Sequence, residues 1–378
     1  MTVTDYRICG TLRGTEREEI WIVDGRISHS APAGHVRQVR GYAYPGLVDA
    51  HSHPGLSYSP NPVSDAEVIR RLDYACSFGV TTIREMGSQR DVAGLAAPGR
   101  VKVLRAGRHI ARFKRYLRHI ALECEPAQLP QVAADQARRG DGWIKIVGDW
   151  IDRDVGDLRP LWPGDILREA VAAAHEEGAR VAVHSFATET VDDLLEAGVD
   201  SIEHGTGMTR DHLLEAAARG IIVDPTMYQY GTFADIAAQA GRFPVYRERM
   251  LGMYARMREQ LALMVETGTH FVMGTDTSGE PEGRSIGMEL ECAVSLGMPP
   301  ELAMAAASYS GRELLGLSNW QEGAPADIVV YADDPERDIS LVHRPSHVFV
   351  DGIEADAGVM GTDQAGAGMR GTGEAGSR

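Results

Sequence analysis

Short apolar runs alternate with helix-like stretches along most of the chain, beginning at about residue 46. Helix-like segments such as 165–177 and 246–267 separate the apolar runs. This alternation predicts βαβ units around a parallel sheet. Uninterrupted Val and Ile are typical of strands that are buried on both faces. The runs are GVTTIRE (79–85), WIKIVG (143–148), ARVAVHS (179–185), DSIEHG (200–205), GIIVDPT (220–226) and THFVMGTD (269–276).

Strand-and-turn patterns mark both ends of the chain. Two β-type runs (19–23 and 37–44) precede residue 46, and two more (326–331 and 347–352) follow a helix-like run over 300–315. We expect the two ends to join in one small β-sandwich domain. The residues from 357 onward are rich in Gly, Ala and Thr and predict a disordered tail. The predicted division is a small β domain (1–45 and 318–356), an α/β TIM-like (β/α)8 barrel (46–317) and a tail (357–378).

One short helix is predicted between two histidine-bearing strands. Thr190 is followed three residues later by Asp193, which is the pattern of a capping box, and Gly198 stands where a helix ends. Each flanking strand carries a histidine near its carboxyl end.

Composition narrows the class of protein. With 378 residues, 43% of them hydrophobic, the chain fits one barrel-sized domain and a minor one. The formal charge of −16 would repel phosphate backbones, so no nucleic-acid partner is expected. The four cysteines lie far apart, which argues against a disulfide framework and a cysteine zinc site. Without an apolar leader or a membrane-length apolar stretch, we expect a cytoplasmic protein with no membrane partner; a homo-oligomer is left open.

Among thirteen histidines, four stand out because they lie at the ends of predicted strands. His51 and His53 are two residues apart, so a strand would point both imidazoles to one side. His184 and His204 end two further strands. A structural position in the core or at the surface, without a role in metal binding, is favoured for His29, His35, His175, His212, His343 and His347.

Two other side chains extend this pattern. Asp276 closes the phrase MGTD, as a metal ligand and proton acceptor or as a helix cap. Lys145 lies between Ile144 and Ile146 in a buried strand, where an unpaired charge costs several kcal/mol unless the lysine reaches the surface. Active sites of α/β barrels are built from several strand ends on one face. Imidazole together with carboxylate suits zinc or a similar divalent ion. The pattern predicts a metal-dependent enzyme.

These residues lie in phrases that resemble the amidohydrolase superfamily, and in particular its prolidase-like and aminoacylase-like (imidazolonepropionase-related) branch. The phrases follow the family's order over nearly the whole chain except the tail. They are PGLVDAHSHP (45–54), GVTTIREMG (79–87), WIKIV (143–147), VAVHSFATE (181–189), AGVDSIEHG (197–205), VMGTDTSG (272–279) and ADIVVYADDP (326–335).

The resemblance implies a binuclear centre of two divalent ions, with zinc favoured. His51, His53 and Asp276 would bind the more buried ion, and His184 and His204 the other. Lys145 would carry a carbamate, formed with carbon dioxide, that bridges both. Asp276 would take the proton of a metal-bridging hydroxide and pass it to the leaving amine.

The resemblance also implies a small-molecule substrate, an N-acyl amino acid or dipeptide-like amide. Tyr228, with Tyr230 as second choice, would clamp the substrate's free carboxylate. His109 and His119 lie in RAGRHIARFKRYLRHI (105–120), which departs from the branch's glycine- and histidine-rich loop, and either could contact substrate. Two further positions differ from the family's pattern. Glu85 stands where an aspartate is frequent, and Ser308 begins Ser-Tyr-Ser where a Thr-x-Asn-like pattern is expected.

Two alternative functions are kept. A mononuclear deaminase or cyclic-amide hydrolase of the same superfamily is disfavoured by Lys145, which such branches typically lack. A non-catalytic scaffold is disfavoured because none of the six ligands is missing.

Overall fold

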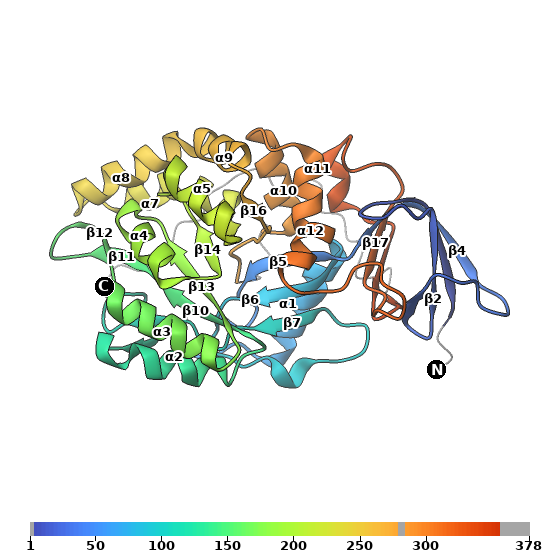
Figure 1. Ribbon diagram of the computed structural model, residues 1–378, viewed down its shortest axis with the longest axis horizontal. Helices are drawn as coiled ribbons and strands as arrows, with labels where there is room; N and C mark the ends of the chain where they lie inside the picture. The colour runs from blue at the N-terminus through green and yellow to red at the C-terminus, as the bar shows by residue number, and fades with distance from the viewer. Residues whose placement is uncertain (1–3, 279–283, 356–378) are drawn as a thin grey trace.

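A computed structural model describes residues 4–278 and 284–355. The predicted disordered tail lies outside the described residues. A sheet built from both ends of the chain packs beside a larger α/β region of strands and helices (Figure 1).

The sheet from the two chain ends, called here the terminal sheet, has seven strands. β1 pairs in parallel with β4, and the other neighbours are antiparallel. The expectation that the two ends meet is confirmed, because β17 pairs with β4. A two-sheet sandwich is not confirmed, because these hydrogen-bonded strands form one sheet. In order across the sheet they are β19 (Ile353–Glu354), β18 (His347–Val350), β17 (Ile328–Tyr331), β4 (Arg37–Pro45), β1 (Tyr6–Leu12), β2 (Glu19–Val23) and β3 (Arg26–Ser28).

Parallel strands form the centre of the α/β region, which confirms the predicted α/β class with a parallel sheet. They lie in two arrays. One is β5 (Leu47–Ser52), β6 (Val80–Glu85) and β7 (Lys102–Arg105). The other is β16 (His270–Phe271), β15 (Ile222–Asp224), β14 (Ser201–His204), β13 (Arg180–Ser185), β10 (Trp143–Val147), β8 (Ile110–Arg112) and β9 (Leu122–Cys124).

Hydrogen bonds join β5 to the segment that follows β16. The backbone N–H of Ala50 donates to the carbonyl of Met273 (2.9 Å), and that of Asp276 donates to the carbonyl of His51 (2.7 Å). This seam connects the two arrays and brings the ends of β5 and β16 together.

Helices surround the parallel strands (Figure 1). They are α1 (Asp65–Ser77), α2 (Leu129–Ala137), α3 (Gly164–Glu176), α4 (Thr188–Ala197), α5 (Arg210–Arg219), α6 (Met227–Gly231), α7 (Phe233–Gln239), α8 (Pro244–Ala255), α9 (Met257–Glu266), α10 (Ile286–Ser295), α11 (Pro300–Ala307) and α12 (Tyr309–Leu314). Short 3-10 turns cover η1 (Ala93–Leu95), η2 (Pro126–Gln128) and η3 (Ile339–His343), and β11 (Asp149–Asp152) pairs with β12 (Asp157–Pro160) as a hairpin.

Three helix predictions need correction. The run 246–267 is two helices that meet at Arg256, and the run 300–315 is broken at Ser308, whose hydroxyl donates to the carbonyl of Pro45 (2.6 Å). The capping box is wrong, because α4 begins before Thr190. Gly198 does end α4, with a φ of 74°.

Two apolar layers cover the parallel strands. Ile144 and Ile146 lie in the large core between the strands and the helices. A smaller cluster that includes Ala50, Trp143 and Ala182 fills the opposite side. Since side chains alternate along a strand, Lys145 lies on this opposite side, as its position between two isoleucines predicted.

Candidate metal centre

His51, His53 and Asp276 meet at the seam between the two strand arrays. Oδ1 of Asp276 lies 3.4 Å from Nε2 of His51 and 3.3 Å from Nε2 of His53. Burial opposes ionisation of Asp276, but the nearby imidazoles outweigh it and hold the pKa of this carboxyl well below its ordinary value. The two Nε2 atoms and one carboxylate oxygen therefore point to a common place.

Two imidazoles are oriented by hydrogen bonds on their Nδ1 atoms. Nδ1 of His53 lies 2.7 Å from the carbonyl of Gly87. Since a carbonyl only accepts, Nδ1 carries a hydrogen, and in the neutral ring Nε2 carries the lone pair. Nδ1 of His204 lies 2.7 Å from the hydroxyl of Thr226. Partners of this kind orient metal-binding histidines in general.

His184 and Lys145 complete the buried group. The imidazole centroid of His204 lies 4.7 Å from that of His184 and 5.2 Å from that of His51. Nζ of Lys145 and Nε2 of His184 are buried and have no hydrogen-bond partner among the described residues. Burial lowers the pKa of Lys145 to about 8 and that of His204 to about 3. In the neutral forms of these side chains, the amine of Lys145 and one ring nitrogen of His204 carry lone pairs that a metal ion could accept.

This donor set fits divalent metal ions. Ligand atoms of His51, His204 and Asp276 all lie within 4.8 Å of one another. Neutral imidazoles, a carboxylate and orphaned buried nitrogens are what zinc or a similar ion would satisfy. The six predicted ligands are thus brought to one place in the fold.

Backbone strain marks the same strand ends. His204 has a φ of 71°, Thr226 of 40° and Asp276 of 48°. Non-glycine residues rarely adopt these values, and they cluster at functional sites where the surrounding structure enforces them.

Three buried carboxylates hold the chain just beyond the ligand-bearing strands. Asp49 accepts from the backbone and hydroxyl of Thr275 (3.0 and 2.7 Å), next to Asp276. Asp149 accepts from the N–H groups of Phe186 (3.1 Å) and Ala187 (3.0 Å), which follow His184. Glu289 accepts from the N–H groups of Met227 (2.6 Å) and Tyr228 (2.8 Å), which follow Thr226. Sequence patterns did not reveal these contacts, because each joins separate strands or helices.

Four of the candidate ligands, all histidines, belong to a closed circle of aromatic rings. His51, His53, His109, Tyr116, Trp150, His184 and His204 form a closed circle in which neighbouring ring centroids are 4.5–6.0 Å apart. Tyr116 and Trp150, whose rings are 4.5 Å apart, were not singled out in the sequence. Together with His109 they form the part of the circle that contains no candidate ligand.

His109 and His119 have different surroundings. His109 is buried, its ring nitrogens have no hydrogen-bond partner among the described residues, and its ring lies 6.0 Å from that of His53. His119 is exposed, and its carbonyl accepts from Gln89 and Arg108. The structure brings His109 to the cluster but gives no support to His119 as a substrate contact.

Tyr228 and Tyr230 also differ. The hydroxyl of Tyr230 donates to the carbonyl of Met253 (3.0 Å) inside the core, which gives no support to a substrate role. Tyr228 is partly buried and lies beneath the guanidinium of Arg284, 5.7 Å from its ring centroid. Arg284 also donates to the carbonyl of Asp276 (3.1 Å) and to Gln229 (2.6 Å). Sequence reasoning missed Arg284, for which no local pattern gives a signal.

Five other histidines make contacts away from this group. Their rings contact the backbone carbonyl of Trp320 (His29) and the carboxylates of Asp200 (His175), Asp192 (His212), Glu291 (His343) and Glu354 (His347).

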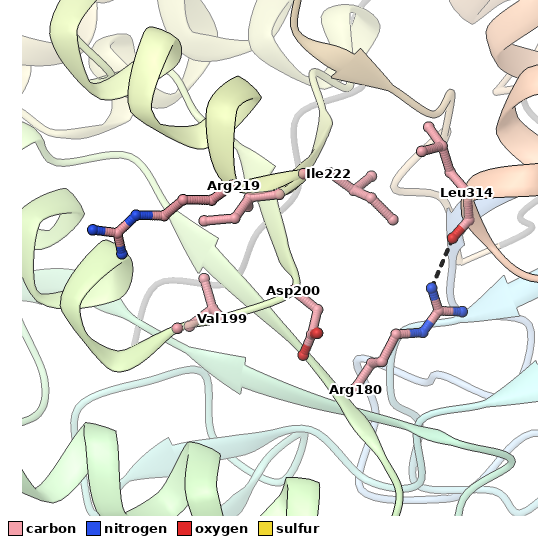
Figure 2. Close-up of a pocket in the computed structure, with 9 residues that line it drawn as sticks. Arg180, Val199, Asp200, Arg219, Ile222 and Leu314 are labelled. Atoms are coloured by element: carbon pink, nitrogen blue, oxygen red, sulfur yellow. Dashed lines mark hydrogen bonds between the residues drawn. The ribbon is translucent and has the colours of Figure 1, made fainter.

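A cavity of about 230 Å³ lies at the opposite, amino ends of the strands. Figure 2 shows Arg180, Asp200 and Ile222 at its wall, at the beginnings of β13, β14 and β15. Both guanidinium groups beside it donate to backbone carbonyls, Arg180 to that of Leu314 and Arg219 to that of Leu195. This cavity contains none of the candidate metal ligands, which, apart from Lys145 within β10, lie at or beyond the carboxyl ends of the strands.

Comparisons with known proteins identify the family of the chain. The model of the amidohydrolase family matches residues 42–354. Uncharacterized proteins of Mycobacterium bovis and Mycobacterium tuberculosis are 40% identical over 337 residues, which cover 88% of this chain and 91% of theirs. In the described part of the chain, no helix is long and apolar enough to cross a membrane.

Solved structures share the fold. A Xaa-Pro dipeptidase with bound methionine in its active site has a TM-score of 0.78 at 22% identity, covering 93% of this chain and 100% of its own. A prolidase complexed with N-methylphosphonate-L-proline has a TM-score of 0.77 at 19% identity, covering 93% and 99%.

Proposed function

Since the chain belongs to the amidohydrolase family and is an enzyme that hydrolyses carbon–nitrogen bonds, we propose that it cleaves an amide next to a free carboxylate. The substrate would be an N-acyl amino acid or a dipeptide-like small molecule. We also infer that the two parallel arrays form one (β/α)8 barrel, since the hydrogen bonds between β5 and the segment after β16 join them.

The observation that carries the proposal is the convergence of six donor residues in one buried place. His51, His53 and Asp276 would hold one divalent ion, and His184 and His204 the other. Bound zinc ions would supply Lewis acidity for the scissile carbonyl and for water. Lys145 would join both ions as a carbamate: its neutral amine adds to carbon dioxide, the N–C bond forms and one proton leaves.

Asp276 is placed to move a proton. Its carboxylate lies between Nε2 of His51 and Nε2 of His53, and its low pKa makes it an anion at neutral pH. It would accept the proton that the attacking water loses and return it to the amine nitrogen as the C–N bond breaks.

The carboxylate of the substrate would bind near Arg284 and Tyr228. A guanidinium presents several N–H donors in a fork that matches a carboxylate. Among the described residues, Arg284 hydrogen-bonds to the carbonyl of Asp276 and the side chain of Gln229, both through Nη1. His109 would contribute a further polar contact, and Tyr116 with Trp150 would face apolar parts of the substrate.

A deaminase or cyclic-amide hydrolase is the second candidate. Lys145 disfavours the mononuclear form of this alternative, because its buried amine has no hydrogen-bond partner among the described residues. A bridging carbamate would give it one.

Product analysis of zinc-supplied protein separates the two functions. A panel of N-acyl amino acids, dipeptides, cyclic amides and heterocyclic amines would be tested, with metal content measured in the same samples. Release of an amino acid is expected. Release of ammonia alone, from heterocyclic amines, would exclude amide cleavage even with the metals bound.

The carboxylate site has its own readout. Tyr228→Phe and Arg284→Gln should raise KM for carboxylate-bearing substrates by about 10-fold or more, because a hydrogen bond to a charged group contributes about 1.5–3 kcal/mol. The matched control is the same substrate with its carboxylate converted to an amide, for which KM should change little. Equal changes for both substrates would contradict the assignment.

A further inference from the structure

A buried ion pair lies next to His51, on the side away from Asp276. Arg84 on β6 and Glu203 on β14 both have fully buried side chains, and Nη2 of Arg84 lies 3.0 and 3.1 Å from the two carboxylate oxygens. Nδ1 of His51 lies 2.9 Å from Oε2 of Glu203. This contact is close but angled, since Nδ1 has no well-aligned hydrogen-bond partner.

The pair fixes both the main chain and the ring of His51. Nε of Arg84 donates to the carbonyl of Ala50 (2.6 Å), the residue before His51. The hydroxyl of Ser201 donates to Oε1 of Glu203 (2.6 Å) and accepts from Nη1 of Arg84 (3.2 Å). Oε1 thus accepts from Ser201 and Arg84, while Oε2, which also accepts from Arg84, is the oxygen that faces His51.

His51 differs from its neighbours in the charge of its partner. His53 and His204 contact a carbonyl and a hydroxyl through Nδ1, whereas His51 contacts a carboxylate. A carboxylate on the far nitrogen orients an imidazole and makes it a stronger metal ligand. Asp224 is also close to His51 and Glu203, but Arg84 already supplies a cation to Glu203, which disfavours a further metal ion there.

Packing alone does not explain two buried charges. Replacing a buried ion pair by apolar side chains of similar volume is often neutral or stabilising, whereas removing one partner is strongly destabilising. Arg84 and Glu203 lie close to apolar residues such as Trp143, whose ring is 4.6 Å from the guanidinium. An apolar pair could fill the same space.

We propose that Arg84 and Glu203 act as positioning residues that hold His51 with Nδ1 toward Glu203 and Nε2 toward the metal centre. The proposal rests on the proposed metal-dependent function. In this proposal, Glu203 orients the imidazole of His51 and makes it a stronger metal ligand. Arg84 neutralises the charge of Glu203 and holds its carboxylate in place.

The first experiment measures metal binding in a variant that removes both charges. Arg84→Met with Glu203→Met should fold, because no unpaired charge is left. Co²⁺ and Zn²⁺ would be titrated into metal-free protein in competition with a chelator, with the visible spectrum of Co²⁺ recorded. Affinity should fall by about 10–100-fold and the spectrum should change. Arg312→Met with Asp327→Met removes another buried ion pair, which contacts none of the proposed ligands; it is the matched control and should bind metal like the wild type.

Wild-type affinity and spectrum in the folded double variant would overturn the proposal and leave the proposed function intact. Absence of metal from the wild type would instead contradict the proposed function.

A second experiment needs no variant of the ion pair. Nitrogen NMR of zinc-loaded wild-type protein labelled at histidine, with His51 assigned through His51→Gln, reports which ring nitrogen carries hydrogen. A protonated Nδ1 and a metal-bound Nε2 are expected. Metal on Nδ1 of His51 would overturn the proposal, whatever the double variant does.

Discussion

Lys145 carries a buried amine whose role depends on covalent chemistry. Burial lowers its pKa, and its Nζ has no hydrogen-bond partner among the described residues. If a carbamate on Lys145 joins two ions, Lys145→Ala should contain at most one ion per chain, whereas the wild type should contain two. Turnover should fall at least 100-fold. Elemental analysis and rate measurement on the same samples test this.

Two controls separate the carbamate from a simple positive charge. Lys145→Arg keeps the charge but cannot form a carbamate and should fail as well. Short carboxylic acids with bicarbonate should partly restore Lys145→Ala. Full metal content and normal turnover in Lys145→Ala would show that the lysine is not a ligand.

At the level of elements, α4 is held by a side chain from a different segment. The residue at its N-cap is Ala187, which has no capping side chain, and Asp149 on β11 accepts from the N–H groups of Phe186 and Ala187 instead. Loss of this carboxylate leaves buried donors unsatisfied, which costs about 1–3 kcal/mol for each group. Asp149→Ala should therefore lower the free energy of unfolding by several kcal/mol, measured with urea.

The matched control for this prediction is Asp193→Ala. Asp193 stands within α4 rather than at a cap, so its loss should change stability by less than about 0.5 kcal/mol, as is usual for substitutions away from caps and cores. A larger effect of Asp193→Ala than of Asp149→Ala would restore the sequence-based capping box.

For the whole molecule, metal should stabilise one region more than the other. The proposed ligands belong to the α/β region, while the terminal sheet has its own apolar core around Ile20, Ile22 and Trp320. An ion present at 100 times its Kd stabilises the folded state by about 2.7 kcal/mol. Removal of metal by a chelator should lower Tm and the hydrogen-exchange protection of β13 and β14, with less change in β1 and β4. Equal loss in both regions, or none, would contradict a centre confined to the α/β region.

The sequence by itself determined which residues could be ligands and, for His51, Lys145, His184 and His204, which strand carries them, whereas His53 and Asp276 lie beyond the strands that they were expected to close. Side chains alternate along a strand, so Lys145 had to leave the side of Ile144 and Ile146, and His51 had to share a side with His53. The order of strands and helices likewise predicted a parallel α/β fold. These features depend on neighbours in the chain, and local geometry is enough to fix them.

Only the tertiary structure decided which distant groups contact the ligands. Glu203 lies beside His51 because β14 and β5, which belong to different strand arrays, bring the two side chains together, although 152 residues separate them. Arg284, Trp150 and the break at Ser308 depend in the same way on segments that meet through sheet order and curvature. The sequence pattern of one segment cannot predict such contacts, because the distance and angle between the two side chains are set by how separate elements pack.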